Sequence, residues 1–374
     1  MKKLFSYPVT VCFFLFLFGF SIVNFLTPDK VFSEMENKYL AQCPTLTWSG
    51  LLDSSEKGFA QRFEKYVNEQ FPLRDGWISL KSRAESALGK IENNGIVYGA
   101  DDYLFDKYKS YDTQRLERNL SLLERFAEAH PELPRTLMVI PASYNILSDK
   151  LPRGLGNLDQ LAEIDTLYQR MQRSGYVTVD VASALSQHAQ EEIYYRTDHH
   201  WTTDGAWYGY QAFLQGQGRT AIVPDQALRR STEGFWGTYF SKSKKYDAVA
   251  DTLVWYDLPV DSVTIDGKAV DGMYDFSQLE KRDRYAMFLY ANNGVTIIEN
   301  SAAEPGSILV IKDSYANCFV PFLTQSYSKV VVVDLRSMPT GLAQLIEDEG
   351  IEQLLVLYSF ENLASDSNFP RLLY

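Results

Sequence analysis

The feature that most constrains this chain is an uncharged apolar stretch near its N-terminus. Residues 4–28 contain no charged side chain, and residues 13–18 are phenylalanine and leucine only. A helix rises about 1.5 Å per residue, so about 20 apolar residues are enough to cross a bilayer. Lys2 and Lys3 precede the stretch, and Asp29 follows it. By the positive-inside tendency, the chain after Asp29 lies outside the cytoplasm.

Two roles fit this segment. A cleaved signal peptide also has a basic start and an apolar middle, but residues 21–26 are bulky near their end and offer no good small-x-small cleavage site. We therefore predict that residues 1–28 form an uncleaved membrane anchor, with a signal segment as the alternative. The following residues 29–95 begin as a proline-punctuated linker and continue as a helical region, because apolar residues recur at helical spacing over residues 56–71.

Composition excludes several classes of protein. The 374 residues include 48 acidic and 36 basic side chains, for a formal net charge of −12, which argues against nucleic acid and against anionic lipid headgroups as partners. There are three cysteines without a CxxC pair, so a disulfide-stapled small fold and a cysteine-based zinc site are excluded. With only four histidines, histidine chemistry has few possible locations.

Residues 96–374 follow a strand–helix–strand rhythm and are predicted to form one domain. Short apolar runs, separated mostly by helical lengths of chain, are typical of a parallel sheet with helices on both faces; they lie at residues 136–140, 308–311, 330–333 and 354–357. Between about residues 222 and 300 the pattern changes to short aromatic-rich strands with turns, which predicts a β-rich insertion.

The first place with chemical character is the segment around Asp198, His199 and His200. In an extended backbone, residues two apart point to the same side, so the Asp198 carboxylate can accept the inner N–H of His200. That bond fixes the imidazole tautomer and leaves the outer nitrogen free as a base. His199 is expected to face the other way. A buried structural histidine beside a helix cap and a metal site formed by these three residues are the alternatives.

The second place is the end of the apolar run 308–311, which leads into Lys312, Asp313 and Ser314. In open α/β sheets the carboxyl ends of the strands face the ligand crevice. A serine there can expose its hydroxyl at a helix N-terminus, where backbone N–H groups can stabilise an oxyanion. An inert helix N-cap is the alternative for Ser314 alone. Together with the distant Asp–His pair, the serine completes the parts of a nucleophilic triad.

These two segments together resemble the DHHW family, which is similar to the alginate O-acetyltransferase group of SGNH-like enzymes. The specific matches are the run Asp198-His199-His200-Trp201 and the strand end Lys312-Asp313-Ser314. Shorter supporting matches lie at residues 70–75, 94–99, 141–144 and 237–243. The resemblance implies an α/β fold with an SGNH-hydrolase-like parallel sheet and flanking helices. Lysine stands at position 312, where SGNH enzymes usually carry glycine.

The resemblance also implies roles for individual residues. Ser314 is the expected nucleophile, His200 the base and Asp198 the residue that orients it. Arg336, Asn362 and Trp201 are the candidates for contact with substrate. No metal and no cofactor is required.

The function implied is O-acetylation of a cell-surface or secreted polysaccharide outside the cytoplasm. A membrane-bound O-acyltransferase is the implied supplier of the acyl group. An acetyl esterase using the same triad is one alternative, because only exclusion of water separates the two reactions. A non-catalytic, membrane-tethered glycan-binding or scaffold protein is an alternative of a different class.

Overall fold

The structure of the chain is a computed structural model that describes residues 7–33, 35–36, 38–338 and 341–374. The chain divides into two compact units. One comprises Met1–Asn93 with Lys244–Asp247, and the other comprises Asn94–Ser243 with Ala248–Tyr374. The first break between the units lies between Asn93 and Asn94.

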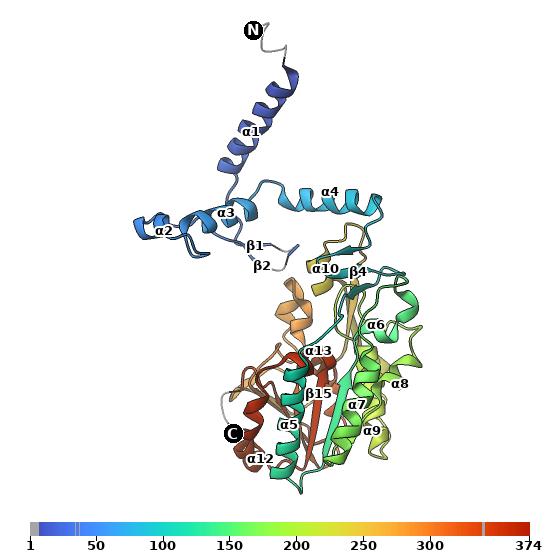
Figure 1. The fold of residues 1–374 in the computed structure, drawn as a ribbon. Coiled ribbons are helices and arrows are strands. Elements are labelled where there is room, and N and C mark those ends of the chain that lie inside the picture. Colours follow the sequence, from blue (N-terminus) through green and yellow to red (C-terminus); the bar gives the residue numbers. More distant parts are fainter. Residues whose placement is uncertain (1–6, 34, 37, 339–340) are drawn as a thin grey trace. The chain divides into compact units, whose positions relative to one another are not determined.

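The first unit contains the apolar N-terminal helix. Helix α1 spans Pro8–Leu26, has a mean hydropathy of 2.4 and buries none of its residues (Figure 1). Among the described residues it is the one helix long and apolar enough to cross a membrane. The remaining elements of this unit are α2 (Trp48–Leu52), α3 (Phe59–Glu69), α4 (Arg74–Ala87) and the two-residue strands β1 (Phe32–Ser33), β2 (Lys38–Tyr39) and β3 (Glu92–Asn93).

One carboxylate, that of Glu36, joins residues 244–247 to the rest of this first unit. Glu36 pairs with Arg74, with Lys38 at 3.7 Å and with Lys244 at 2.7 Å. Burial by itself raises the pKa of Glu36, but the hydrogen bonds and charges of Arg74 and Lys244 outweigh it and lower that pKa. Glu36 therefore stays ionised and ties three separate segments together.

The second unit is built on an eight-stranded sheet in the order β11-β10-β12-β14-β13-β15-β6-β7. The strands β14, β13, β15, β6 and β7 run parallel to one another. Their bounds are β6 Arg135–Ile140, β7 Val177–Thr178, β13 Ser307–Lys312, β14 Lys329–Val333 and β15 Gln353–Ser359. All four predicted apolar runs are therefore strands of this parallel part.

Alternate residues of these strands enter two cores. Met138, Ile140, Ile308 and Val310 pack on one face with helices α8 (Val181–Ser186) and α9 (Thr203–Gly216). Leu137, Val139, Leu309 and Ile311 pack on the other face with α5 (Thr113–Ala129), α7 (Gln160–Arg173), α12 (Leu342–Glu349) and α13 (Phe360–Ser365). Figure 1 shows α5 and α7 running beside β15. The predicted α/β architecture with helices on both faces is confirmed.

The sheet is not parallel throughout, however. Strands β10 (Ser262–Ile265), β11 (Lys268–Val270) and β12 (Val295–Glu299) come from the predicted β-rich insertion and extend the sheet in antiparallel pairing. Along β12 the degree of burial alternates, and Thr296 and Ile298 are the buried residues. One face of β12 is therefore covered, and the strand pairs antiparallel with β14. Two further strands of this region, β8 (Arg229–Phe235) and β9 (Asp251–Tyr256), form an antiparallel pair outside the eight-stranded sheet.

Short elements complete this unit. Strands β4 and β5 form a hairpin, paired antiparallel from Ile96 opposite Asp106. The bounds are β4 Ile96–Tyr98, β5 Leu104–Asp106, α6 Ser143–Ile146, α10 Thr238–Ser243 and α11 Val320–Leu323, with the 3₁₀ turns Ser148–Lys150, Gln226–Leu228, Phe276–Glu280, Arg284–Met287, Ser314–Cys318 (η6) and Phe369–Leu373.

Candidate active site

Ser314 lies at the carboxyl end of the central strand β13 and begins the 3₁₀ turn η6. The residue before it, Asp313, fixes this turn. The Asp313 carboxylate accepts hydrogen bonds from the Tyr315 N–H at 2.9 Å, from the Ser359 N–H at 2.8 Å and hydroxyl at 2.7 Å, and from the Asn362 amide at 2.8 Å. The ends of β13 and β15 are thereby joined around the serine. The helix N-terminus expected at Ser314 is this short 3₁₀ turn.

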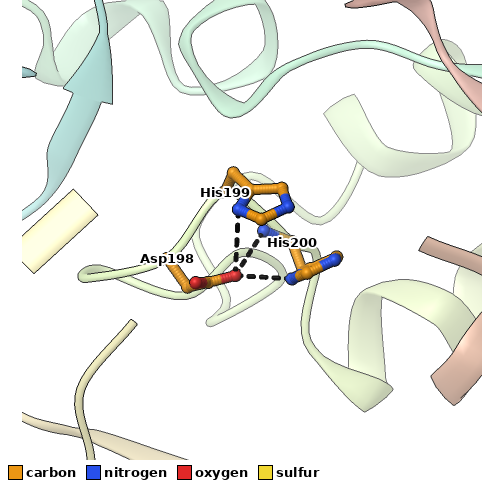
Figure 2. A group of neighbouring side chains, drawn as sticks. All are labelled: Asp198, His199 and His200. Carbon is orange, nitrogen blue, oxygen red and sulfur yellow. Dashed lines mark hydrogen bonds and ion pairs between the residues drawn. The ribbon is translucent and has the colours of Figure 1, made fainter. Parts of the chain in front are cut away.

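Asp198 and His200 lie on a tight loop closed by an antiparallel bridge between Tyr194 and Trp201. Asp198 Oδ1 accepts the backbone N–H of His200 at 3.0 Å and lies 2.5 Å from His200 Nδ1 (Figure 2). Its other oxygen accepts the backbone N–H of Thr238 at 2.7 Å. Both oxygens of the Asp198 carboxylate are therefore hydrogen-bonded, and the carboxylate fixes the orientation of the His200 imidazole.

The outer nitrogen of this imidazole reaches the serine. His200 Nε2 lies 2.8 Å from Ser314 Oγ. Asp198 and His200 are buried, whereas Ser314 is partly exposed. The structure thus brings together the three residues that the sequence singled out, in a continuous hydrogen-bonded chain of the kind that activates a serine hydroxyl.

The charge on Asp198 suits this arrangement. Burial by itself raises the pKa of this carboxyl, but the imidazoles of His199 and His200 and the Thr238 N–H outweigh it and hold the pKa well below its usual range. The carboxylate is therefore ionised near neutral pH, and it favours the tautomer of His200 with the proton on Nδ1 and the lone pair of Nε2 facing Ser314.

Tyr285 supports both partners of the serine–histidine contact. Its ring stacks on the His200 imidazole with centroids 3.9 Å apart and planes at 11°. Its hydroxyl donates to the backbone oxygen of Ser314 at 3.0 Å. Nothing in the sequence distinguishes Tyr285 from the other tyrosines, so this residue could be found only from the structure.

The expectation that His199 faces away from Asp198 is wrong. His199 Nδ1 lies 3.5 Å from Asp198 Oδ1, and the two imidazole centroids are 3.8 Å apart (Figure 2). The loop is turned rather than extended, so the alternation expected of a strand does not apply. His199 Nδ1 also lies 2.8 Å from the Thr238 hydroxyl. Burial and the neighbouring His200 lower the pKa of His199 to about 4, so this imidazole is neutral near neutral pH.

The three candidates for substrate contact occupy different positions. Trp201 has no exposed surface, and its indole N–H donates to the Tyr315 backbone oxygen at 2.8 Å. It therefore supports the turn that carries Ser314 and presents no surface to a substrate, which is different from the contact with substrate that was expected.

Arg336 holds Asp334 in a two-pronged contact, at 2.9 and 2.5 Å. Asn362 donates to Asp313, as described above, and lines a pocket beside the triad.

Asp198, His199 and His200 also satisfy the distance requirement for a metal site, since one ligand atom of each lies within 4.8 Å of the others. Hydrogen bonding describes the group better. Asp198 Oδ1 is already at 2.5 Å from His200 Nδ1 and accepts a backbone N–H, and a cation at this point would have to replace both bonds.

The lysine at position 312 has a local explanation. Its side chain is buried, and its ammonium donates to Asn292 Oδ1 at 2.6 Å and to Asn317 Oδ1 at 2.7 Å. Burial lowers the pKa of Lys312 to about 8, although the nearby Asp334 opposes the shift. The side chain is thus paired within the fold at the end of β13, which shows how a residue other than glycine is accommodated there.

Gly237 fits closely against Asp198, so its replacement by alanine is expected to damage the site. A Cβ at position 237 would lie 2.5 Å from Asp198 Oδ2 and 2.6 Å from Asp198 Cα. The displacement would break the Thr238 bond to the carboxylate and misplace His200. Turnover of an acetyl ester should fall about 100-fold, which is the usual cost of a misplacement near 1 Å. The free energy of unfolding, measured by urea titration, should fall by about 1–3 kcal/mol.

Gly216 provides the matched control. It is the last residue of α9, and a Cβ there would meet nothing within 4 Å. Gly216→Ala should keep full turnover and wild-type stability. Equal turnover in Gly237→Ala and Gly216→Ala would show that the close fit against Asp198 does not matter for the site.

Comparison with known proteins identifies the family of the chain. The family model described as "DHHW protein" matches residues 85–333, which is more than half of the chain. The chain belongs to the DHHW family. The matched span includes both halves of the candidate site, from Asp198 to Ser314, and stops at the end of β14.

Individual relatives of this DHHW protein are distant. The protein named "probable alginate O-acetylase AlgJ" of Azotobacter vinelandii is 27% identical over 183 residues, which cover 46% of this chain and 45% of that protein. The match thus spans less than half of the curated relative.

Two solved structures share the fold. A DHHW family protein from Eubacterium siraeum has a TM-score of 0.64 at 23% identity, over 75% of this chain and 96% of that one. PatB1 of Bacillus cereus has a TM-score of 0.60 at 23% identity, over 72% of this chain and 97% of that one. At this identity the likeness shows that the fold is shared.

Proposed function

We propose that this chain is an O-acyltransferase that acetylates a polysaccharide outside the cytoplasm through Ser314, His200 and Asp198. The observation that carries the proposal is the unbroken chain of contacts at 2.5 Å and 2.8 Å from the carboxylate through the imidazole to the hydroxyl. The relative named as an alginate O-acetylase supports O-acetyl transfer as the reaction class.

The first half of the reaction loads the serine. His200 Nε2 takes the hydroxyl proton as Ser314 Oγ bonds to the carbonyl carbon of the donor ester. When the tetrahedral intermediate collapses, the bond to the donor's alcohol oxygen breaks, and that oxygen receives the proton from His200. Acetyl is left on Ser314 as an ester. Asp198 stays ionised throughout and stabilises the imidazolium that forms between the two transfers.

The second half moves acetyl to the acceptor. A sugar hydroxyl gives its proton to His200 Nε2 and attacks the ester carbon, and the bond to Ser314 Oγ breaks as that oxygen takes the proton back. The outcome depends on whether a sugar hydroxyl or water reaches the ester first. Hydrolysis is thus the competing reaction, which would make the protein an esterase.

The placement outside the cytoplasm rests on α1. This helix has the length and hydropathy of a membrane span and follows Lys2 and Lys3, which favours a cytoplasmic N-terminus. An acyl donor made in the cytoplasm would then have to reach Ser314 across the membrane. We propose that a membrane-bound O-acyltransferase supplies it.

The test is to trap the acyl-enzyme and follow the fate of its acetyl group. The full chain in detergent, mixed with an aryl acetate, should gain one acetyl group, and peptide mass spectrometry should place it on Ser314. Addition of an oligosaccharide should discharge the enzyme with acetyl found on the sugar. Ser367→Ala, at an exposed serine on the same unit, should load like the wild type.

Three other results are informative. Release of free acetate only, with every acceptor tried, would favour the esterase. An acetyl group on a residue other than Ser314 would refute the triad. Absence of any acyl-enzyme, with polymer binding retained in Ser314→Ala, would favour the non-catalytic glycan-binding protein.

A further inference from the structure

A pocket of about 240 Å³ lies beside the triad in the second unit. This is somewhat below the range of about 300–1,000 Å³ found for pockets that hold drug-sized molecules, so it suits one ring-sized group. Its charged and polar walls include Asp106, His199, Thr238, Lys242 and Glu361.

Three wall residues connect the pocket to the catalytic chain. The ring of His199 is 3.8 Å from that of His200, and the Thr238 N–H is bound to Asp198 at 2.7 Å. Tyr315 follows Ser314 directly, and its ring centroid is 5.1 Å from that of His200. A molecule held in the pocket therefore lies against the residues that position the serine and its base.

The pocket is rich in hydrogen-bond acceptors and poor in cations. Asp106 and Glu361 both line it. The Glu361 carboxylate accepts a hydrogen bond from Gln160 Nε2 at 3.4 Å, and Lys242 is a nearby cation for both carboxyl groups. Burial, followed by the charge of Asp106, raises the pKa of Glu361 to about 7, and burial also raises the pKa of Asp106. Lys242 is exposed and is the single lysine or arginine in the lining.

This distribution distinguishes between classes of sugar. Carboxylates accept hydrogen bonds and are well matched to the hydroxyl donors of an uncharged sugar. A sugar that bears its own carboxylate would add a third carboxyl group beside these two, and each one that is ionised would repel it in a partly buried space where screening is weak. Sites that select carboxylates instead present arginine in a two-pronged contact, and Arg336 already holds Asp334 in that way.

We propose that this pocket is the acceptor subsite and that it selects an uncharged sugar over a uronate. The inference rests on the proposed transferase function, because it names the acceptor of that same serine. It leaves the identity of the polysaccharide open within the class of neutral polymers.

The experiment measures acetyl transfer from an aryl acetate to two tetrasaccharides, one neutral and one made of uronates. The readout is the ratio of the two kcat/KM values, so a general loss of activity in a variant cancels. The wild type should favour the neutral sugar by about tenfold or more, as expected when like charges are brought together. Glu361→Gln and Asp106→Asn should each reduce the ratio about threefold or more. Glu347→Gln, at an exposed position of α12, should leave it unchanged.

A binding measurement separates this inference from the proposed function. Ser314→Ala should bind the neutral tetrasaccharide more tightly than the uronate when no donor is present. Equal or tighter binding of the uronate would overturn the subsite, as would a ratio that stays the same in both carboxylate variants. Selective binding without any transfer by the wild type would contradict the transferase and leave the pocket's preference intact.

Discussion

Replacing Ser314 by alanine is expected to lower acetyl-ester turnover by about 10⁴- to 10⁶-fold, because the residues of a triad act as a unit and the variant has no nucleophile. His200→Ala should cost a similar factor, since Nε2 is 2.8 Å from the hydroxyl and is the base for both halves of the reaction. The double variant should be no worse than either single one. Steady-state rates with an aryl acetate test all three.

Stability controls make this result interpretable. Ser314 is partly exposed, so removing its hydroxyl should leave the unfolding midpoint close to that of the wild type. Ser367→Ala should retain full turnover. Additive losses in the double variant would mean that Ser314 and His200 do not work in one step, and full turnover of Ser314→Ala would end the proposal of a serine nucleophile.

Asp198→Asn is expected to lower turnover by about 10⁴-fold while leaving the protein folded. An amide at this position can donate to His200 Nδ1, which favours the tautomer with its proton on Nε2. That nitrogen then has no lone pair to take the proton of Ser314. The ratio of variant to wild-type kcat, measured at saturating ester, is the readout, and Asp271→Asn, at an exposed position, is the control.

The same carboxyl should also make stability depend on pH. The pKa of Asp198 is lower in the folded chain than its usual value, so its ionised form stabilises the fold above the unfolded pKa. That contribution is lost as the pH falls toward the folded pKa. The free energy of unfolding of the wild type should therefore decline on acidification more steeply than that of Asp198→Asn. Parallel pH profiles for the two proteins would contradict the assignment of an ionised, hydrogen-bonded Asp198.

Local pattern was enough to predict much of the fold. The apolar runs at residues 136–140, 308–311, 330–333 and 354–357 are strands because buried parallel strands need apolar side chains on both faces. The uncharged N-terminal stretch forms α1 because nothing in it competes with a continuous helix. What the pattern missed was the antiparallel extension by β10 and β12, because the direction of pairing depends on where a distant strand edge is free.

The candidate site, like the fold, could be predicted only in part from the sequence. The sequence by itself determined which residues have the chemistry: a carboxylate two positions before an imidazole, and a serine at the end of a buried strand. Only the tertiary structure decided that His200 and Ser314, which are 114 positions apart, are in contact. It also decided that the Tyr285 ring stacks on His200 and that His199 lies close to Asp198. The pocket lined by Asp106 and Glu361 was likewise visible only in the structure. These features are contacts between side chains from separate elements at one edge of the sheet. The spacing of residues along the chain does not determine which distant residues come into contact when it folds.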